Sequence, residues 1–159
     1  MKKISFTCWV FLLILSSCGT VSSLIIDPSK EISVKDKVVY NALQFEGVKY
    51  RRGGVTTDGF DCSGLVYRSF SIENVLLPRQ SMYMANKGVA IALDQVKKGD
   101  LLFFITGRKS KNINHVGLIV SVEANEINFI HSTNGRGVVI SSLSEKYWKN
   151  AFLKATKVL

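Results

Sequence analysis

Cys62, His115 and His131 are the residues of this chain whose types and order could support covalent catalysis. A thiol nucleophile needs a lowered pKa, a partner that moves protons and donors for the oxyanion. The sequence holds two histidines, of which His115 begins the apolar segment HVGLIV and His131 closes NFIH. On neighbouring antiparallel strands, one nitrogen of His115 could face the thiol while His131 holds the other. The pattern favours a Cys-His pair, and a buried structural cysteine is the alternative.

The segment around Cys62 predicts a helix that begins at this residue. Asp61 is a good N-cap, and apolar residues recur on one face of a helix over residues 62–72. A helix N-terminus alone stabilises a thiolate by about 0.3–1 kcal/mol, less than one pKa unit, so most of a large pKa drop must come from a histidine. Two histidines and a thiol could also ligate zinc, but a thiol at a helix start favours covalent chemistry, so no metal and no cofactor are expected.

The rest of the chain separates into helices first and strands afterwards. The spacing predicts a helix over Val34–Phe45 and a short one from Pro78 to about Asn86. From residue 100 onward the segments are apolar and β-rich. These segments are Leu101–Ile105, His115–Val122, Ile127–His131, Val138–Ile140 and Phe152–Val158. The segregation predicts a single α+β domain, in which an antiparallel sheet carries helices on one side.

The first eighteen residues have the pattern of an export signal. Lys2 and Lys3 precede an uncharged apolar run over residues 4–15, which suits a signal-peptide core and is too short to span a bilayer. The run ends in LSSC, which resembles the lipobox of bacterial lipoproteins, so we expect Cys18 to be lipidated; ordinary secretion after cleavage nearby is the alternative. Residues 1–17 are then a signal peptide, residues 18–33 a lipidated N-terminus and tether, and residues 34–159 the folded domain.

Export limits the partners that this chain can have. Its formal charge of +9 falls to +7 without the two signal lysines, which favours anionic partners, but nucleic acid is not expected outside the cytoplasm. After processing, Cys62 is the only free thiol, because Cys8 leaves with the signal and Cys18 is acylated. The lipid would anchor a monomer to a membrane in the cell envelope. This is the periplasmic face of the outer membrane if the cell has two membranes, and otherwise the outer face of the plasma membrane.

Five motifs, in order, resemble those of the NlpC-type (p60) cell-wall cysteine peptidases. They are FDCSGLV at 60–66, LPRQS at 77–81, KKGDLLFF at 97–104, NHVGLIV at 114–120 and FIHS at 129–132. The resemblance covers roughly residues 36–158. It implies a papain-like fold, in which the nucleophile helix packs on an antiparallel sheet that presents the base, and it makes residues 34–159 an NlpC-type catalytic domain.

The resemblance assigns the catalytic residues one by one. Cys62 matches the nucleophile, His115 the base, and His131 the polar residue that orients the base. The connection between the two histidines, which runs through residues 123–126, looks longer than the family usually has, and this predicts an extended hairpin turn. Ser132 or Asn134 is therefore an alternative to His131.

Four further residues match positions around the family's substrate cleft. Tyr50 matches a tyrosine that can assist the oxyanion, Asp61 and Ser63 match a pair that helps bind the peptide, and Arg79 matches a common arginine near the cleft. Each also has a purely structural interpretation. Asp61 could act only as a helix cap, Ser63 as a solvated residue, Tyr50 as a packing aromatic and Arg79 as an ion-pair partner.

The activity that this resemblance implies is hydrolysis of an amide bond in peptidoglycan peptides. Cys62 would attack a D-glutamyl-diamino acid bond or a D-alanyl cross-link, and His115 would protonate the departing amine. Two other classes remain open. One is a non-catalytic wall-binding lipoprotein, and the other is a papain-like lipid acyltransferase, whose histidine precedes its cysteine in the chain.

Overall fold

The described part of the chain begins just before the first predicted helix. A computed structural model describes residues 31–107, 110–124 and 126–159, and residues 32–159 form one unit. The expected signal peptide, Cys18 and most of the tether lie outside the described residues. None of the helices in the described ranges combines the length and the apolar composition that crossing a bilayer requires.

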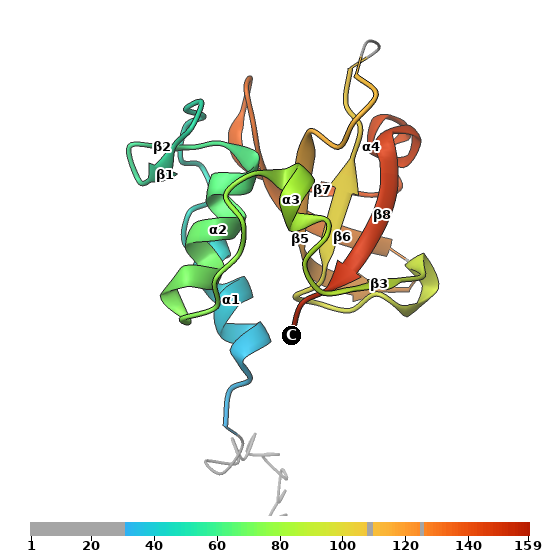
Figure 1. Cartoon of the computed structure of the whole chain (residues 1–159), viewed down its shortest axis with the longest axis horizontal. Coiled ribbons are helices and arrows are strands. Elements are labelled where there is room, and N and C mark those ends of the chain that lie inside the picture. The colour runs from blue at the N-terminus through green and yellow to red at the C-terminus, as the bar shows by residue number, and fades with distance from the viewer. Residues whose placement is uncertain (1–30, 108–109, 125) are drawn as a thin grey trace, which may run out of the picture. The chain divides into compact units, whose positions relative to one another are not determined.

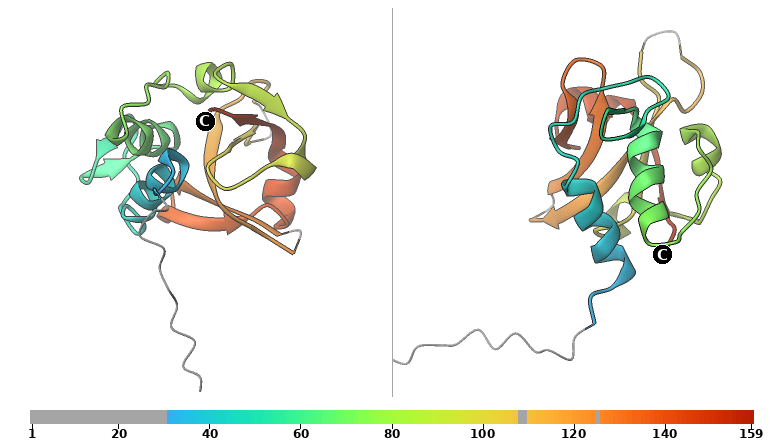
Figure 2. Two further views of the ribbon diagram at one scale, coloured as in Figure 1. Left: turned by 90° about the horizontal axis from the view of Figure 1, so that it is seen from below. Right: turned by 90° about the vertical axis from the view of Figure 1, so that its left-hand side faces the viewer.

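Two helices form one side of the domain. Helix α1 (Val34–Leu43) and helix α2 (Cys62–Ile72) pack on each other and on the same side of the sheet (Figures 1 and 2). Asp61 caps α2, since its carboxylate accepts a hydrogen bond from the Gly64 N–H at 2.6 Å. The predicted helices at these positions are confirmed to within two residues at each end.

The strands of the second half form one antiparallel sheet. They are β3 (Val89–Ile91), β4 (Leu101–Phe104), β5 (His115–Glu123), β6 (Glu126–Thr133), β7 (Gly137–Ser142) and β8 (Phe152–Lys157). Their order across the sheet is β3-β8-β4-β5-β6-β7. The predicted α+β class with a central antiparallel sheet is confirmed.

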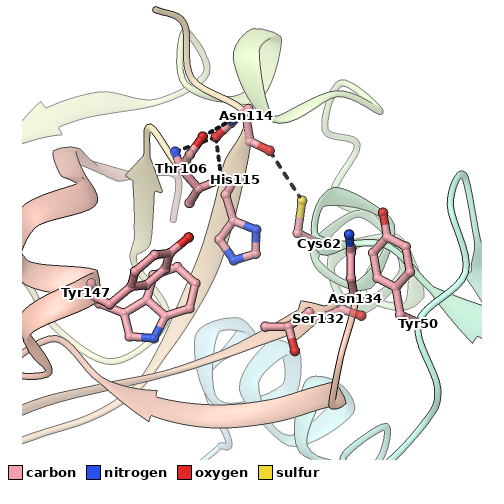
Figure 3. Close-up of a pocket in the computed structure, with 10 residues that line it drawn as sticks. Tyr50, Cys62, Thr106, Asn114, His115, Ser132, Asn134 and Tyr147 are labelled. Carbon is pink, nitrogen blue, oxygen red and sulfur yellow. Dashed lines mark hydrogen bonds between the residues drawn. The ribbon is translucent and has the colours of Figure 1, made fainter. Parts of the chain in front are cut away.

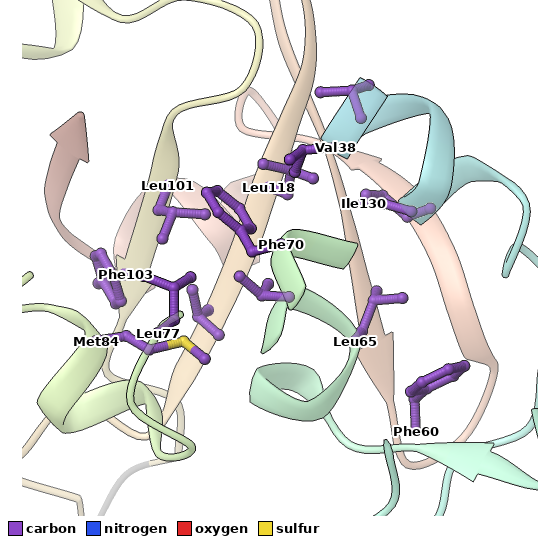
Figure 4. Close-up of a cluster of buried hydrophobic side chains, with 14 of the residues drawn as sticks. Val38, Phe60, Leu65, Phe70, Leu77, Met84, Leu101, Phe103, Leu118 and Ile130 are labelled. Carbon is purple, nitrogen blue, oxygen red and sulfur yellow. The ribbon is translucent and has the colours of Figure 1, made fainter. Parts of the chain in front are cut away.

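Both faces of the central strands are buried. In β4, Leu101 and Phe103 pack toward α1 and α2 in the cluster of Figure 4, whereas Leu102 and Phe104 pack in a second cluster with Trp148. Trp148 belongs to helix α4 (Lys146–Ala151), which the sequence did not predict. The expectation of helices on one side only is therefore wrong. The uninterrupted apolar run LLFF follows from this double burial, which stabilises the fold by roughly 1.5–3 kcal/mol for each large side chain.

The segment around Arg79 also differs from its prediction. The helix expected from Pro78 to about Asn86 is one turn long, α3 (Ser81–Met84). Gln80 is still extended, which carries Arg79 back toward the start of α2, where its side chain forms an ion pair.

Several short elements interrupt what were expected to be loops. The loop before Cys62 is a small hairpin of β1 (Val55–Thr56) and β2 (Gly59–Phe60), and a 3-10 turn, η1 (Leu93–Gln95), precedes β4. Strands β5 and β6 stay paired up to Glu123 and Glu126, so only two positions separate them. The extended hairpin turn predicted here is wrong, because strand pairing continues to Glu123 and Glu126.

Candidate active site

Cys62 is the first residue of α2, and its thiol is half-buried at the centre of a cleft. The sulfur lies 3.9 Å from the backbone oxygen of Asn114, which accepts from the thiol (Figure 3). The Asn114 side chain is fixed in turn, because its Oδ1 accepts from the Thr106 N–H at 2.8 Å and its Nδ2 donates to the Thr106 oxygen at 2.7 Å. The loop before β5 thus sets the direction of the thiol.

His115 begins β5 and faces Cys62 across the cleft (Figure 3). Its Nε2 lies 2.9 Å from Nδ1 of His131, which is on the neighbouring strand β6. Because Nε2 is engaged with His131, Nδ1 is the nitrogen left for the thiol. The geometry expected from adjacent strands is therefore present, and both imidazoles are buried.

The two histidines are held by further residues on β7 and α4. The second ring nitrogen of His131, Nε2, lies 3.0 Å from Oγ of buried Ser141. Trp148 stacks on His115 with ring centroids 5.1 Å apart and meets His131 edge-on at 4.5 Å. Every nitrogen of the pair except Nδ1 of His115 thus has a protein partner among the described residues.

Burial keeps the thiol and both imidazoles uncharged at neutral pH. Desolvation raises the pKa of Cys62, although a hydrogen bond from the Val116 N–H opposes this. Desolvation also lowers the pKa of His115, and it lowers the pKa of His131 together with the charges of His115 and Arg136. The resting pair is therefore a neutral thiol beside a neutral imidazole, whose free Nδ1 can act as a base.

Asp61 carries the only ion pair of the described residues that lies at the cleft. Arg79 donates two hydrogen bonds to the Asp61 carboxylate, from Nη1 to Oδ1 at 2.9 Å and from Nη2 to Oδ2 at 2.8 Å. Burial raises the pKa of Asp61, but the hydrogen bonds from Arg79 and from the Gly64 and Gly53 N–H groups outweigh it, so this pKa is lowered overall.

Ser63 joins the same network. Its hydroxyl accepts from Arg79 Nη1 at 2.9 Å and lies 3.3 Å from Asp61 Oδ1. Arg79 also reaches the Gly54 oxygen, which lies so close to Gly64 that a Cβ at position 64 would clash with it. Glycine at this position lets the loop pack directly on α2.

Two cavities meet at Cys62 and share Tyr50 and Asn114 as lining residues. The first, which we call the histidine-side cavity, has a volume of about 450 Å³; its other lining residues are Thr106, His115, Ser132, Thr133, Asn134, Tyr147 and Trp148. The second, the arginine-side cavity, has a volume of about 610 Å³; its other lining residues are Arg52, Gly53, Asp61, Ser63, Arg79, Gln80, Ser81, Met82 and Ile113.

Tyr50 lies where the two cavities join. Burial raises its pKa, as do the Cys62 thiol and the charge of Asp61, so its hydroxyl stays protonated at neutral pH and can donate. The structure thus brings Tyr50 to the side of the nucleophile.

The structure brings together all seven cleft residues that the sequence singled out. Of the alternatives to His131, Ser132 is used elsewhere, because its hydroxyl donates to the Phe60 oxygen at 2.8 Å. Sequence reasoning missed Ser141 and Trp148, which have no local signature. Asn114, in contrast, directly precedes His115 in the motif NHVGLIV and could have been considered.

The fold and the cleft together define a domain in which a helix-borne thiol faces a strand-borne histidine. Comparison with known proteins agrees, since residues 47–157 match the NlpC/P60 family. The chain belongs to the NlpC/P60 family.

Three similar proteins illustrate the range of this family. The chain is 34% identical over 131 residues to the murein DD-endopeptidase MepS/murein LD-carboxypeptidase of Escherichia coli, which covers 82% of this chain and 66% of that protein. It is 32% identical to the gamma-D-glutamyl-L-lysine dipeptidyl-peptidase of Bacillus subtilis, over 76% of this chain and 40% of that one. A crystal structure of an NlpC/P60 family protein from Bacillus cereus superposes with a TM-score of 0.69 at 28% identity, over 81% of this chain and 41% of that one. The match thus spans less than two thirds of each of these proteins.

Proposed function

We propose that this chain is a peptidoglycan hydrolase that cleaves an amide bond in cell-wall peptides through Cys62, His115 and His131. The observation that carries the proposal is the free Nδ1 of a buried, neutral His115 opposite the Cys62 thiol. The names of the relatives, which are a murein endopeptidase and a γ-D-glutamyl peptidase, support peptidoglycan peptides as the substrate. The bond is a D-glutamyl-diamino acid bond or a D-alanyl cross-link.

The first chemical step is attack by the thiol on the amide carbonyl. The Cys62 proton passes to Nδ1 of His115 as the sulfur–carbon bond forms, which gives a tetrahedral intermediate. The Cys62 backbone N–H, at the open start of α2, and the Tyr50 hydroxyl donate to its oxyanion. His115 then protonates the departing amine as the carbon–nitrogen bond breaks, leaving a thioester on Cys62.

The second step returns the enzyme to its starting state. Water attacks the thioester, His115 takes the water proton, and the thiolate leaves and recovers the proton, so that the peptide is released as a carboxylic acid. The free Nδ1 requires the proton of His115 to be on Nε2. His131 Nδ1 must then accept, and its Nε2–H donates to Ser141. In these tautomers the Ser141 hydroxyl is the acceptor at the end of the hydrogen-bond chain.

We test the activity with the full-length chain, peptidoglycan and mass spectrometry of the released fragments. Cys62→Ala should lower product formation by roughly 10⁴-fold or more, because it removes the nucleophile. When the reaction is stopped by denaturation, mass spectrometry of the wild-type chain should show a thioester adduct on Cys62. The variant should show no such adduct. Equal product release by both proteins would contradict the proposal, and wall binding without products would favour a binding lipoprotein.

Lipid anchoring is a second part of the proposal. The signal pattern over residues 1–17, with Cys18 after it, supports a lipoprotein that acts at a membrane surface in the cell envelope. A labelled fatty acid fed to the producing cells should be incorporated into the wild-type chain and not into Cys18→Ala. Labelling of both proteins, or of neither, would rule out Cys18 as the lipid site.

A further inference from the structure

The position of His115 defines which way a bound substrate lies along the cleft. His115 lines the histidine-side cavity and not the arginine-side cavity, whereas Cys62 lines both. Because the departing amine must receive its proton from His115, the amine part of the substrate lies in the histidine-side cavity. The acyl part, which stays bonded to Cys62, then lies in the arginine-side cavity.

Asp61 has no open position for a substrate cation in that cavity. Oδ1 accepts from Arg79 Nη1, the Gly64 N–H and the Ser63 hydroxyl, and Oδ2 accepts from Arg79 Nη2 and the Gly53 N–H. The carboxylate and the guanidinium also cancel in charge. A free N-terminal ammonium on the acyl part would therefore have to break this network in order to bind.

Arg52 supplies the remaining charge of the arginine-side cavity. Its side chain is exposed, lines the cavity, and makes no ion pair with the described residues. Its positive charge lowers the pKa of Tyr50, which lines both cavities, against the larger effect of burial. With Asp61 and Arg79 paired, the described lining of this cavity carries one unpaired cation, whereas none of the described residues that line the histidine-side cavity is an acid, a lysine or an arginine.

We propose that the arginine-side cavity selects an acyl part with a free carboxylate, which pairs with Arg52, and that a free N-terminal amine is not required. This inference rests on the proposed function. Cell-wall peptides offer such a carboxylate in two places. A γ-linked D-glutamyl residue leaves its α-carboxylate free at the scissile bond, and a diamino dicarboxylic acid before a D-alanyl bond carries one a residue further back.

Matched synthetic peptides test the carboxylate. One pair contains the D-glutamyl-diamino acid bond with the α-carboxylate free or amidated, and a second pair contains the D-alanyl cross-link with the diamino acid carboxylate free or amidated. With the wild-type chain, amidation should lower kcat/KM about tenfold in the pair whose bond is cleaved, as expected for a charge-assisted hydrogen bond at a partly exposed site. Acetylation of the N-terminus should change kcat/KM less than about twofold, by the same argument.

Variants at neighbouring arginines separate Arg52 from a general effect of charge. In Arg52→Gln the free and amidated peptides should be cleaved at nearly equal rates, whereas Arg51→Gln, which removes the same charge next to the cavity, should keep the tenfold preference. Equal rates for the two peptides in the wild-type chain, or the same preference in Arg52→Gln, would overturn the inference. A requirement for a free N-terminus would also overturn it. Failure of the proposed function gives another result. In that case none of the peptides is cleaved, or they are cleaved equally well by the wild-type chain and by Cys62→Ala.

Discussion

The two cavities that meet at Cys62 handle ionisable groups in opposite ways. On the histidine side, the sheet and α4 bury His115 and His131 without any acidic partner among the described residues, and both are neutral. On the arginine side, the start of α2 and the loops around it hold the Asp61–Arg79 pair fully charged and bonded. On the histidine side, burial keeps both imidazoles uncharged. On the arginine side, two opposite charges balance each other in an ion pair.

This difference matches what each side must do in the proposed reaction. A base has to change its protonation state during turnover, and burial without a counter-ion keeps the imidazole ready to accept and return a proton. The start of α2 has to hold the thiol in one place, which a permanently ionised cap does better. We therefore expect changes on the histidine side to act mainly on rate, and changes on the arginine side mainly on stability and substrate choice.

Apart from loss of the nucleophile itself, the largest effect should come from His115→Gln. The glutamine fills similar space but cannot shuttle a proton, so kcat should fall by about 10²–10⁴-fold while the fold is kept. Alkylation of Cys62 by iodoacetamide at pH 7 should also slow, since the thiol loses its base. Wild-type alkylation kinetics in a protein with unchanged unfolding behaviour would show that His115 does not serve Cys62.

The pH dependence of stability should be the next largest effect. In the unfolded chain the histidines titrate near their ordinary pKa of 6.5, and burial lowers both pKa values in the folded chain. Below pH 6.5 the unfolded state therefore binds more protons, and stability falls by up to about 1.4 kcal/mol per pH unit for each histidine until the folded pKa is reached.

Urea unfolding between pH 7.5 and 5.5 measures this slope. His131→Gln removes one of the two buried groups, and its stability should fall about half as steeply with decreasing pH. Parallel curves for the two proteins would mean that His131 is charged, or open to solvent, in the folded state.

The two sides also differ in how far the sequence alone predicted them. Asp61 as a cap and Cys62 at a helix start depend on neighbouring residues, so a local pattern is enough to predict them. His115 beside His131 required only that the two strands be adjacent. Arg79 as the partner of Asp61 was not predicted, because an extended segment brings it from 18 residues away in place of the expected helix.

The residues that enclose the two histidines could not be predicted from the sequence for a related reason. Trp148 reaches them from α4, whose six residues have no N-cap hydrogen bond and no long apolar periodicity. Ser141 differs from the many other serines only through its register opposite Phe129 on β6. Contacts set by sheet register and by packing of distant segments are properties of the assembled fold, and no local pattern encodes them.

Ser141→Ala should have a smaller effect on the histidine side. It leaves the Nε2–H of His131 without its acceptor in a buried site, so the productive tautomers are less favoured and kcat should fall about three- to tenfold, with little change in KM. Nitrogen NMR of the two imidazoles should show a mixture of tautomers in place of one. Ser142→Ala is the matched control, because Ser142 instead pairs with Ser144 and should leave both kcat and the spectrum unchanged. If Ser141→Ala showed the same single tautomer as the wild-type chain, Ser141 would not have this role in favouring the productive tautomers.

Asp61→Asn should give the smallest effect and separates the two sides most cleanly. Asparagine still caps α2 but loses the charge pair with partly exposed Arg79, so stability at pH 7 should fall by about 1 kcal/mol. Arg79→Gln should cost a similar amount, and the double variant little more, if the two residues act as a pair.

The pH at which the stability difference between the wild-type chain and Asp61→Asn disappears tests the contrast between the two sides. Because the folded pKa of Asp61 is lowered, its contribution is present above its ordinary pKa of 3.8 and is lost only as the pH falls through the lower, folded value. Between pH 7.5 and 5.5 the wild-type and Asp61→Asn curves should therefore run parallel while both decline with the histidines. Convergence of the two curves in that window would mean that Asp61 is not held ionised by Arg79, and the contrast between a neutral side and a paired side would fail.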